Sequence, residues 1–199
     1  MFRWCALSAF VVCAGNLLGA TFGTSFSLVG GAADLVLDEP RGRLYLVNTA
    51  LSRVEVYSVA QKRLLTPITT DSSPLSAAMS RSGRYLYVAS YDSSSLNIID
   101  LESQTVSSRV SLPARPEGVA VGSDERVLIS TVGTGAGNAT SVLLLYTPKA
   151  GAATVDSIPI TPAAAGAPVF PAPSGRPFLS VRSQLAASRN GAIIAGVNV

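Results

Sequence analysis

Residues 75–116 form a row of short apolar runs separated by turn residues. Side chains alternate with a period of two at 77–80 and 84–90, which is typical of strands whose two faces have different surroundings. The turn between these strands contains Gly83, and glycine readily takes the positive φ of a tight turn. Two further strands are expected at 96–101 and 106–110. The stretch therefore predicts four antiparallel strands in about forty residues, which is the size of one β-propeller blade.

Copies of this stretch lie on both sides of it in the sequence. Residues 44–48 align with residues 86–90 at a spacing of 42, and the same spacing places Val54 on Leu96. One spacing that serves two separate strands indicates a structural repeat. A looser copy follows with an inserted loop at 133–140, and the last copy contains only half a blade. We therefore expect an all-β chain of four-stranded blades at about residues 33–74, 75–116, 117–148 and 183–199.

The predicted blades number about three and a half, whereas propellers close with roughly four to eight. Each open end of such an arc would leave the apolar face of a blade uncovered. Three explanations stay open: these residues belong to a longer propeller, two or more chains complete a ring by self-association, or the array is open with capped ends. Residues 22–29 are a candidate for a further strand that helps to close a ring.

Residues 1–20 differ in kind from the repeats. Arg3 precedes an apolar run at 6–14 that only Ser8 interrupts, and small residues end the segment at Ala20. This order is typical of a secretory signal peptide that is cleaved after export. The alternative is an uncleaved membrane anchor, but the apolar run is shorter than the roughly 20 residues that span a bilayer. We expect a secreted, periplasmic or cell-surface protein with no membrane span after cleavage.

Cleavage changes the composition of the chain. Cys5 and Cys13 both lie in the predicted signal peptide, and the whole sequence contains no histidine. The exported chain therefore lacks thiolate chemistry, histidine-based catalysis and the usual ligands of zinc, copper and haem. Loss of Arg3 leaves 14 basic and 12 acidic residues with no block of like charge. This balance indicates no nucleic-acid partner.

An insertion at residues 149–182 separates the third and fourth copies. It is rich in alanine, glycine and proline. Because proline removes backbone donors and restricts φ, the insertion has room only for a short strand such as residues 154–160. One interpretation is a surface excursion between blades. The other is a lid or a partner-binding loop, since long loops often carry function.

Two of these runs resemble a known repeat family. The YVTN-family β-propeller repeats have the consensus Tyr-Val-Thr-Asn, which is similar to Tyr-Leu-Tyr-Val-Ala-Ser at 85–90 and to Leu-Tyr-Leu-Val-Asn at 44–48. The family's next strand resembles Leu-Asn-Ile-Ile-Asp-Leu at 96–101. The match covers roughly residues 32–148 and 183–199. It implies a β-propeller in a bacterial protein that is exported or held at the cell surface, and it implies a fold more firmly than an activity.

Carboxylates remain as candidates for chemistry. Aspartates recur at strand ends and turns, namely at Asp34, Asp38, Asp92, Asp100 and Asp124. We expect each one to cap its turn through nearby backbone groups rather than to act in catalysis. Calcium suits an all-oxygen set, but the sequence has no dense Asp-x-Asp-x-Asp run. We therefore predict no catalytic residue, no metal site and no cofactor.

Tyrosines are a second kind of candidate. Tyr45 and Tyr87 occupy equivalent positions of successive blades, so we expect them to pack between blades. The alternative is a stacking platform for a sugar. Tyr91 lies just past its strand and beside the turn at Asp92, so this pair is the predicted ligand contact at the rim. The ligand that we expect is an unidentified protein or carbohydrate.

The pattern as a whole favours a non-catalytic exported propeller that acts as a binding or cell-surface scaffold. The alternative is part of a propeller enzyme of the lactonase or lyase kind, in which acidic residues, and often histidine and a metal, gather around the central channel. The absence of histidine speaks against this alternative for the residues at hand. A site of that kind would then belong to blades that this sequence does not include.

Overall fold

A computed structural model describes residues 26–131, 142–149, 153–159 and 184–197. The predicted signal peptide at 1–20 and most of the insertion at 149–182 lie outside these residues. Within the described ranges every regular element is a β-strand. The same ranges contain no helix that is long and apolar enough to cross a membrane. The predicted all-β class is therefore confirmed.

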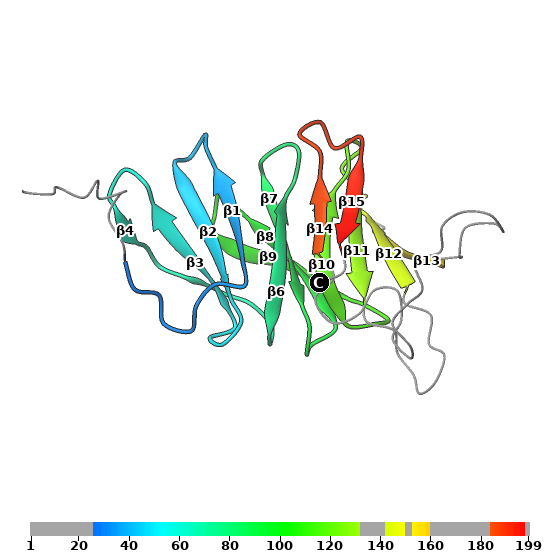
Figure 1. Cartoon of the computed structure of the whole chain (residues 1–199), viewed down its shortest axis with the longest axis horizontal. Helices are drawn as coiled ribbons and strands as arrows, with labels where there is room; N and C mark the ends of the chain where they lie inside the picture. Colours follow the sequence, from blue (N-terminus) through cyan, green and yellow to red (C-terminus); the bar gives the residue numbers. More distant parts are fainter. Residues whose placement is uncertain (1–25, 132–141, 150–152, 160–183, 198–199) are drawn as a thin grey trace, which may run out of the picture.

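The strands form four antiparallel sheets that follow one another along the chain (Figure 1). The first sheet consists of β1 (Asp34–Asp38), β2 (Arg43–Asn48), β3 (Arg53–Ser58), β4 (Arg63–Leu64) and β5 (Ile68–Thr69). Both β4 and β5 pair with β3, so together they act as one split outer strand. Pro67, which has no backbone N–H to donate, lies between them. The second sheet consists of β6 (Pro74–Met79), β7 (Tyr85–Ser90), β8 (Ser95–Asp100) and β9 (Thr105–Ser111).

The third sheet extends beyond the predicted end of its repeat at Pro148. It consists of β10 (Pro116–Val121), β11 (Val127–Thr131), β12 (Val142–Thr147) and β13 (Thr154–Pro159). The fourth strand, β13, pairs with β12 and lies in the stretch assigned to the insertion, which corrects that boundary. Proline is tolerated there because Pro159 is the last residue of the strand. The fourth sheet consists of β14 (Gln184–Ala187) and β15 (Ile194–Val197).

The 42-residue repeat is also present in the backbone conformation. Positive φ angles recur in pairs with this spacing, at Gly31 and Ser73, Ser52 and Ser94, Lys62 and Gln104, and Gly83 and Glu125. The expected positive φ at Gly83 is thus confirmed, at 70°. Turn hydrogen bonds repeat as well, because the Thr70 amide donates to the Ser52 carbonyl at 3.0 Å and the Leu112 amide donates to the Ser94 carbonyl at 2.8 Å. The turns of the first two sheets are therefore built alike.

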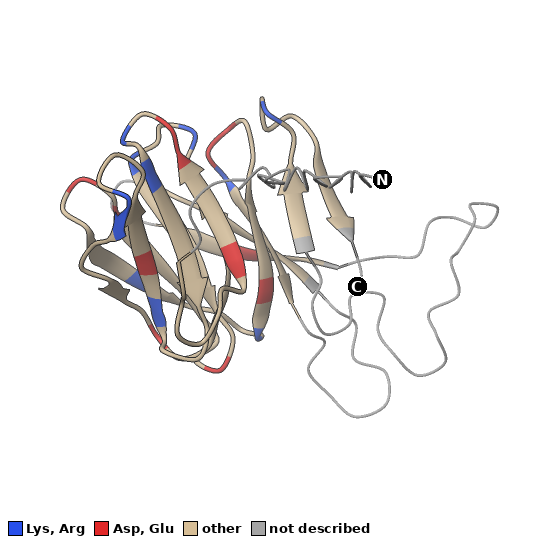
Figure 2. Cartoon of the chain, turned by 60° about the vertical axis from the view of Figure 1, so that its left-hand side comes forward, with Lys and Arg blue, Asp and Glu red and all other residues tan. Residues whose placement is uncertain are grey.

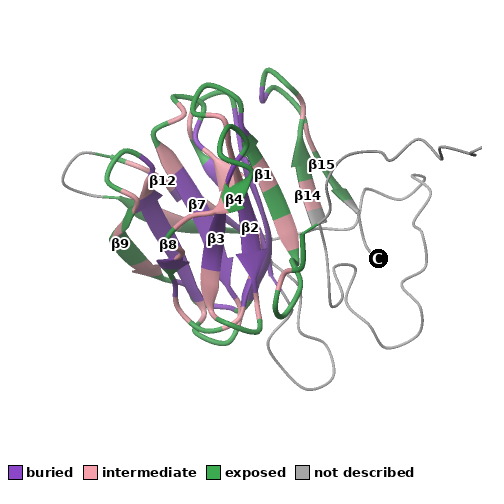
Figure 3. Cartoon of the chain, turned by 90° about the vertical axis from the view of Figure 1, so that its left-hand side faces the viewer, coloured by how far each residue is buried: buried purple, intermediate pink, exposed green. Residues whose placement is uncertain are grey.

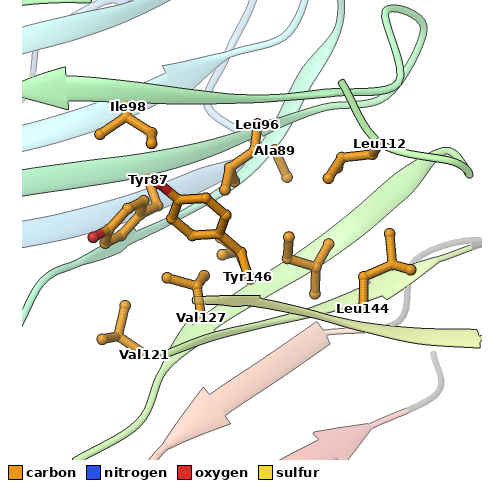
Figure 4. Close-up of a cluster of buried hydrophobic side chains, with 11 residues drawn as sticks. Tyr87, Ala89, Leu96, Ile98, Leu112, Val121, Val127, Leu144 and Tyr146 are labelled. Carbon is orange, nitrogen blue, oxygen red and sulfur yellow. The ribbon is translucent and has the colours of Figure 1, made fainter. Parts of the chain in front are cut away.

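Two clusters of buried apolar side chains lie between neighbouring sheets. The cluster between the first and second sheets contains Tyr45, Val47, Val54, Val56, Ile68, Ala77, Leu86, Val88, Ile99 and Leu101. The cluster between the second and third sheets is drawn in Figure 4. There Tyr87, which is 2% exposed, packs edge-on against Tyr146 with 6.1 Å between ring centroids. Tyr45 is fully buried in the first cluster. The prediction that Tyr45 and Tyr87 pack between blades is confirmed.

No described sheet packs on the other face of the first sheet, which we call the open face, and residues 26–31 cover part of this face. The Phe26 ring stacks on Tyr57 of β3 with centroids 4.7 Å apart and an interplanar angle of 5°. The side-chain amide of Asn48 donates to the Val29 carbonyl at 2.7 Å. The expected strand at 22–29 is therefore not formed over its described part, since this segment lies against the sheet through a ring contact and does not join a ladder.

Candidate functional site

A pocket of about 530 Å³ lies where the innermost strands of the four sheets approach one another. We call it the channel pocket. It is lined by Gly30, Gly31, Ala32, Ala33, Asp34, Thr49, Leu75, Ser76, Glu117 and Leu185. These residues belong to β1, β6, β10 and β14 or directly precede or follow a strand of the first sheet. The volume is within the range of sites that hold small molecules.

Two β-bulges contribute residues to the lining of this pocket. The register of β6 against β7 shifts between Pro74 and Ser76, and the register of β10 against β11 shifts between Pro116 and Gly118. A bulge inserts one unpaired residue into a strand and redirects its side chain. The residue in the β10 bulge is Glu117, and the residue in the β6 bulge is Leu75. Both residues line the pocket.

Hydrogen bonds across three sheets hold one wall of the pocket. One carboxylate oxygen of Asp34 accepts from the Ser76 hydroxyl and from the Ala77 amide, both at 2.9 Å. Its other oxygen accepts from the Leu35 amide at 2.8 Å. The Ser76 oxygen in turn accepts from the Val119 amide at 3.3 Å. Because these bonds link β1 to β6 and β6 to β10, they fix the positions of the innermost strands relative to one another.

Among the described residues that line the pocket, both charged groups are acidic. They are Asp34 and Glu117, and Glu117 is only 3% exposed. The Thr49 hydroxyl, also in the lining, donates to the Pro74 carbonyl at 2.6 Å. Carboxylate and hydroxyl oxygens accept hydrogen bonds, so the lining suits hydroxyl donors better than it suits an anion. Over the described part of the chain, no three Asp, Glu, His or Cys side chains are grouped closely enough to hold a metal ion.

The predicted ligand residues, Tyr91 and Asp92, lie in the turn between β7 and β8. The Tyr91 amide donates to the Ser73 carbonyl at 2.9 Å, and the Arg115 guanidinium lies 5.2 Å from the centre of the Tyr91 ring. The exposed Asp92 carboxylate accepts from the Ser73 hydroxyl. This turn follows Ser90, the last residue of β7, which pairs with Pro74, the first residue of β6. Neither Tyr91 nor Asp92 lines the channel pocket. A ligand contact at Tyr91 and Asp92 stays a prediction.

Three of the five aspartates cap their turns as expected. Asp38 accepts from the Arg41 amide at 3.2 Å, Asp100 accepts from the Glu102 amide at 2.9 Å, and Asp124 accepts from the Arg126 amide at 3.2 Å. Asp34 and Asp92 differ. The Asp34 carboxylate accepts a hydrogen bond from β6 of the second sheet, and the Asp92 carboxylate accepts one from the segment that leads into β6.

Electrostatic shifts follow from these contacts. Hydrogen bonds from the Ser103 and Glu102 amides lower the pKa of Asp100, with a further contribution from Arg84. The bond from the Arg126 guanidinium lowers the pKa of Asp124. Figure 2 shows acidic and basic residues interspersed over the described strands and turns.

Glu117 and Ser76 were not among the site residues predicted from the sequence. A signal for Glu117 was present, because Pro74 and Pro116 occupy equivalent positions of successive repeats and each precedes a bulge residue, Leu75 and Glu117 respectively. Ser76 had no such signal. The contribution of residues 30–33 had no comparable signal. These residues reach the pocket because the segment that contains them is held over the first sheet, in part by the bond from Asn48.

Solved structures with a similar arrangement of sheets identify the fold. Hydrazine synthase from Kuenenia stuttgartiensis superimposes with a TM-score of 0.52 at 15% identity, over 92% of this chain and 58% of that one. The β-propeller domain of Cps50 (Swd1) from Myceliophteria thermophila superimposes with a TM-score of 0.55 at 14% identity, over 67% of this chain and 41% of that one. The fold is that of a β-propeller. The four sheets are therefore blades, and the predicted fold class is confirmed.

A functionally unknown protein from Desulfotomaculum acetoxidans also matches, with a TM-score of 0.50 at 18% identity, over 59% of this chain and 36% of that one. The chain thus spans less than two thirds of each of these three structures. No protein-family model matches the sequence, and no curated protein matches it. At these identities the likeness concerns the fold alone.

Proposed function

We propose that this chain is an exported, non-catalytic β-propeller module of the YVTN-repeat kind that binds a small hydroxyl-rich ligand, such as a carbohydrate, in its channel pocket. The observation that carries the proposal is the pocket itself, with walls contributed by four blades and with Asp34 held by three hydrogen bonds. A site whose groups are fixed before binding loses less entropy when the ligand arrives.

The chemistry of the lining supports a neutral, hydroxyl-bearing ligand. Glu117, Thr49 and Ser76 line the pocket, and none of the described residues that line it is a lysine or an arginine. Leu75 and Leu185 add apolar surface that can contact the carbon skeleton of a sugar. This mixture of apolar walls and a few polar groups is usual for small-molecule sites.

Residues 1–20 support export, because a basic residue is followed by an apolar run and then by small residues. Fractionation of the source cells, with N-terminal sequencing of the protein, tests whether the chain is exported and cleaved. We expect the exported form to begin at Thr21. An uncleaved chain in the cytoplasmic fraction would contradict this part of the proposal.

Calorimetric titration with a panel of mono- and disaccharides tests the binding site. Leu75→Trp should abolish binding because the larger side chain fills the pocket, and Glu117→Gln should weaken it about tenfold or more by removing a charged acceptor. Asp92→Ala is the matched control outside the lining and should bind as the wild type does. Binding lost in Asp92→Ala but kept in Leu75→Trp would move the site to the Tyr91 and Asp92 turn.

The same proteins test the absence of catalysis. A pH-stat assay with simple lactones, and an absorbance assay for lyase products, should show no turnover above the uncatalysed rate. Turnover that Glu117→Gln removes would overturn the non-catalytic proposal and favour the enzyme alternative.

A further inference from the structure

One wall of the channel pocket is formed by a segment that has almost no side chains. It consists of Gly30, Gly31, Ala32 and Ala33, all of which line the pocket. Both glycines have a positive φ, 83° at Gly30 and 72° at Gly31. Proteins place glycine where φ is positive, where a Cβ has no room, or where a ligand or another backbone approaches closely. The two glycines of this wall differ in which of these reasons applies.

Packing explains Gly30. A Cβ added there would lie 2.9 Å from Oδ1 of Asn48 and 3.0 Å from the Cβ of Ala50. The same Oδ1 accepts a hydrogen bond from the Leu51 amide at 3.1 Å, so it is held in place. A side chain at Gly30 would therefore displace a buried group that already has a partner.

Neither packing nor conformation explains Gly31. No atom of the described residues lies within 4 Å of the place that its Cβ would take. Ser73, which stands 42 residues later, has a positive φ of 56° although it carries a side chain. The backbone conformation at Gly31 is therefore one that another residue can adopt in this repeat. The remaining reason is the close approach of a ligand, and Gly31 is exposed and lines the pocket.

The next two blades carry a side chain at the place of Gly31. The Ser73 hydroxyl donates to Asp92, and the Arg115 guanidinium lies 5.2 Å from the centre of the Tyr91 ring. Neither Ser73 nor Arg115 lines the channel pocket. In the first blade the counterpart of Asp92 is Ala50, whose side chain has no acceptor. A side chain in place of Gly31 would thus lack the contact that the Ser73 hydroxyl makes outside the pocket.

The wall is anchored on both sides of Gly31. On one side the Asn48 side chain donates to the Val29 carbonyl at 2.7 Å, and Asn48 is the fully buried last residue of β2, a mainly buried strand (Figure 3). On the other side the Ala33 amide donates to the Val47 carbonyl, also of β2, at 2.8 Å. The backbone between the anchors is held against the first sheet. A side chain added at Gly31 therefore takes its volume from the pocket.

We propose that Gly31 determines which ligands the channel pocket accepts, because its missing side chain lets a hydroxyl-rich ligand lie directly against the backbone of residues 30–33. This inference rests on the proposed binding of such a ligand and adds the residue that sets its fit. A backbone amide donates a hydrogen bond and a backbone carbonyl accepts one, so both can bond to hydroxyl groups. The wall thus complements the acidic side of the lining, which contains Asp34 and Glu117.

Gly83 supplies a matched control. Its φ is 70°, and no described atom lies within 4 Å of its Cβ position either, but Gly83 does not line the pocket. Asparagine accepts a positive φ better than most residues, so Gly31→Asn and Gly83→Asn should carry a similar conformational cost. In calorimetric titration with each mono- or disaccharide that the wild type binds, Gly31→Asn should raise the dissociation constant about tenfold or more. Gly83→Asn should leave it unchanged, and urea unfolding should show that the two variants are equally stable.

A chemical series adds the group after the protein has folded. Cys5→Ser and Cys13→Ser remove both native cysteines, so Gly31→Cys in that full chain carries the only thiol. Methyl and benzyl methanethiosulfonate attach a small or a large group to it through a disulfide, and a reducing agent removes the group again. Saccharide binding should weaken more with the benzyl group than with the methyl group and should return on reduction. The same treatment of Gly83→Cys should leave binding unchanged.

The outcomes separate this inference from the proposed function. Equal affinities of Gly31→Asn and Gly83→Asn, or binding that the benzyl group on Gly31→Cys leaves intact, would overturn the inference alone if Leu75→Trp still abolishes binding. A Gly31→Cys thiol that stays unmodified while the Gly83→Cys thiol reacts would also overturn it, because the wall would then be covered. A wild type that binds no saccharide would overturn the proposed function and this inference with it.

Discussion

The first and second blades share one pattern of residues, yet only the second is packed on both faces. Leu101 in the second blade is fully buried, whereas Val59, at the equivalent place in the first blade, is 50% exposed. Ala77 and Leu35 differ in the same direction, at 7% and 60%. The comparison shows that a position in this repeat is buried because another sheet lies against it. The apolar pattern alone is not sufficient.

The largest effect on stability should come from truncating a leucine at equivalent positions of the two blades, one variant at a time. Leu86 is fully buried between the first two blades, so Leu86→Ala should lower the free energy of unfolding by about 2–5 kcal/mol. Leu44, at the equivalent place in the first blade, is only partly buried, so Leu44→Ala should cost about 1 kcal/mol. Urea unfolding of both variants measures the difference. Equal losses would mean that the open face is packed in solution.

The polar link between the two blades should have the next largest effect. Asp34→Ala removes the acceptor of the Ser76 hydroxyl and the Ala77 amide. We expect a loss of about 1–3 kcal/mol because these donors are partly buried and lose their partner. Asp92→Ala serves as the control, since it removes one exposed carboxylate that accepts from Ser73. If the two variants unfold at the same urea concentration, Asp34 does not hold the blades together.

A smaller effect is expected where the open face is covered. Phe26→Ala removes the ring that stacks on Tyr57 and should cost about 1 kcal/mol. The cost is limited because Phe26 is itself 45% exposed. Urea unfolding measures the change, and the near-ultraviolet circular dichroism of tyrosine reports the loss of the stack. An unchanged spectrum would indicate that Phe26 does not cover Tyr57 in solution.

Tyr87→Phe should have the smallest effect on stability at neutral pH. Its effect on stability should appear mainly at alkaline pH. Burial raises the pKa of Tyr87 to about 12, from an ordinary value of 10.0. Burial also raises the pKa values of Tyr45 and Tyr146. Because unfolded tyrosine loses its proton first, stability is intact below pH 10 and falls progressively toward pH 12. The thermal midpoint should therefore fall over that range, and less steeply in Tyr87→Phe.

Absorbance at the tyrosinate band during the same titration is the check on this interpretation. Ionisation of the buried tyrosines should coincide with unfolding. A tyrosinate signal at pH 10 that is smaller in Tyr87→Phe than in the wild type, while both proteins stay folded, would contradict the burial of the Tyr87 ring between the blades.

Local features were predictable from the sequence. The 42-residue period placed the strands of the first two blades and put Tyr45 and Tyr87 between blades, and the glycine of a tight turn predicted the positive φ at Gly83. Each of these depends on alternation along one strand or on the conformation of one turn. Such information lies within a few residues of the chain.

The channel pocket and the open face were decided by the tertiary structure. Asp34 and Glu117 line one pocket although they belong to the first and third blades, because the innermost strands of successive blades converge there. The role of β13 as the fourth strand of its sheet depends on pairing with β12. The stack of Phe26 on Tyr57 depends in the same way on a distant strand. The sequence by itself determined the repeating unit. The packing of one unit on the next decided which side chains are buried and which stay exposed. The reason is that burial depends on neighbours that are remote in the chain.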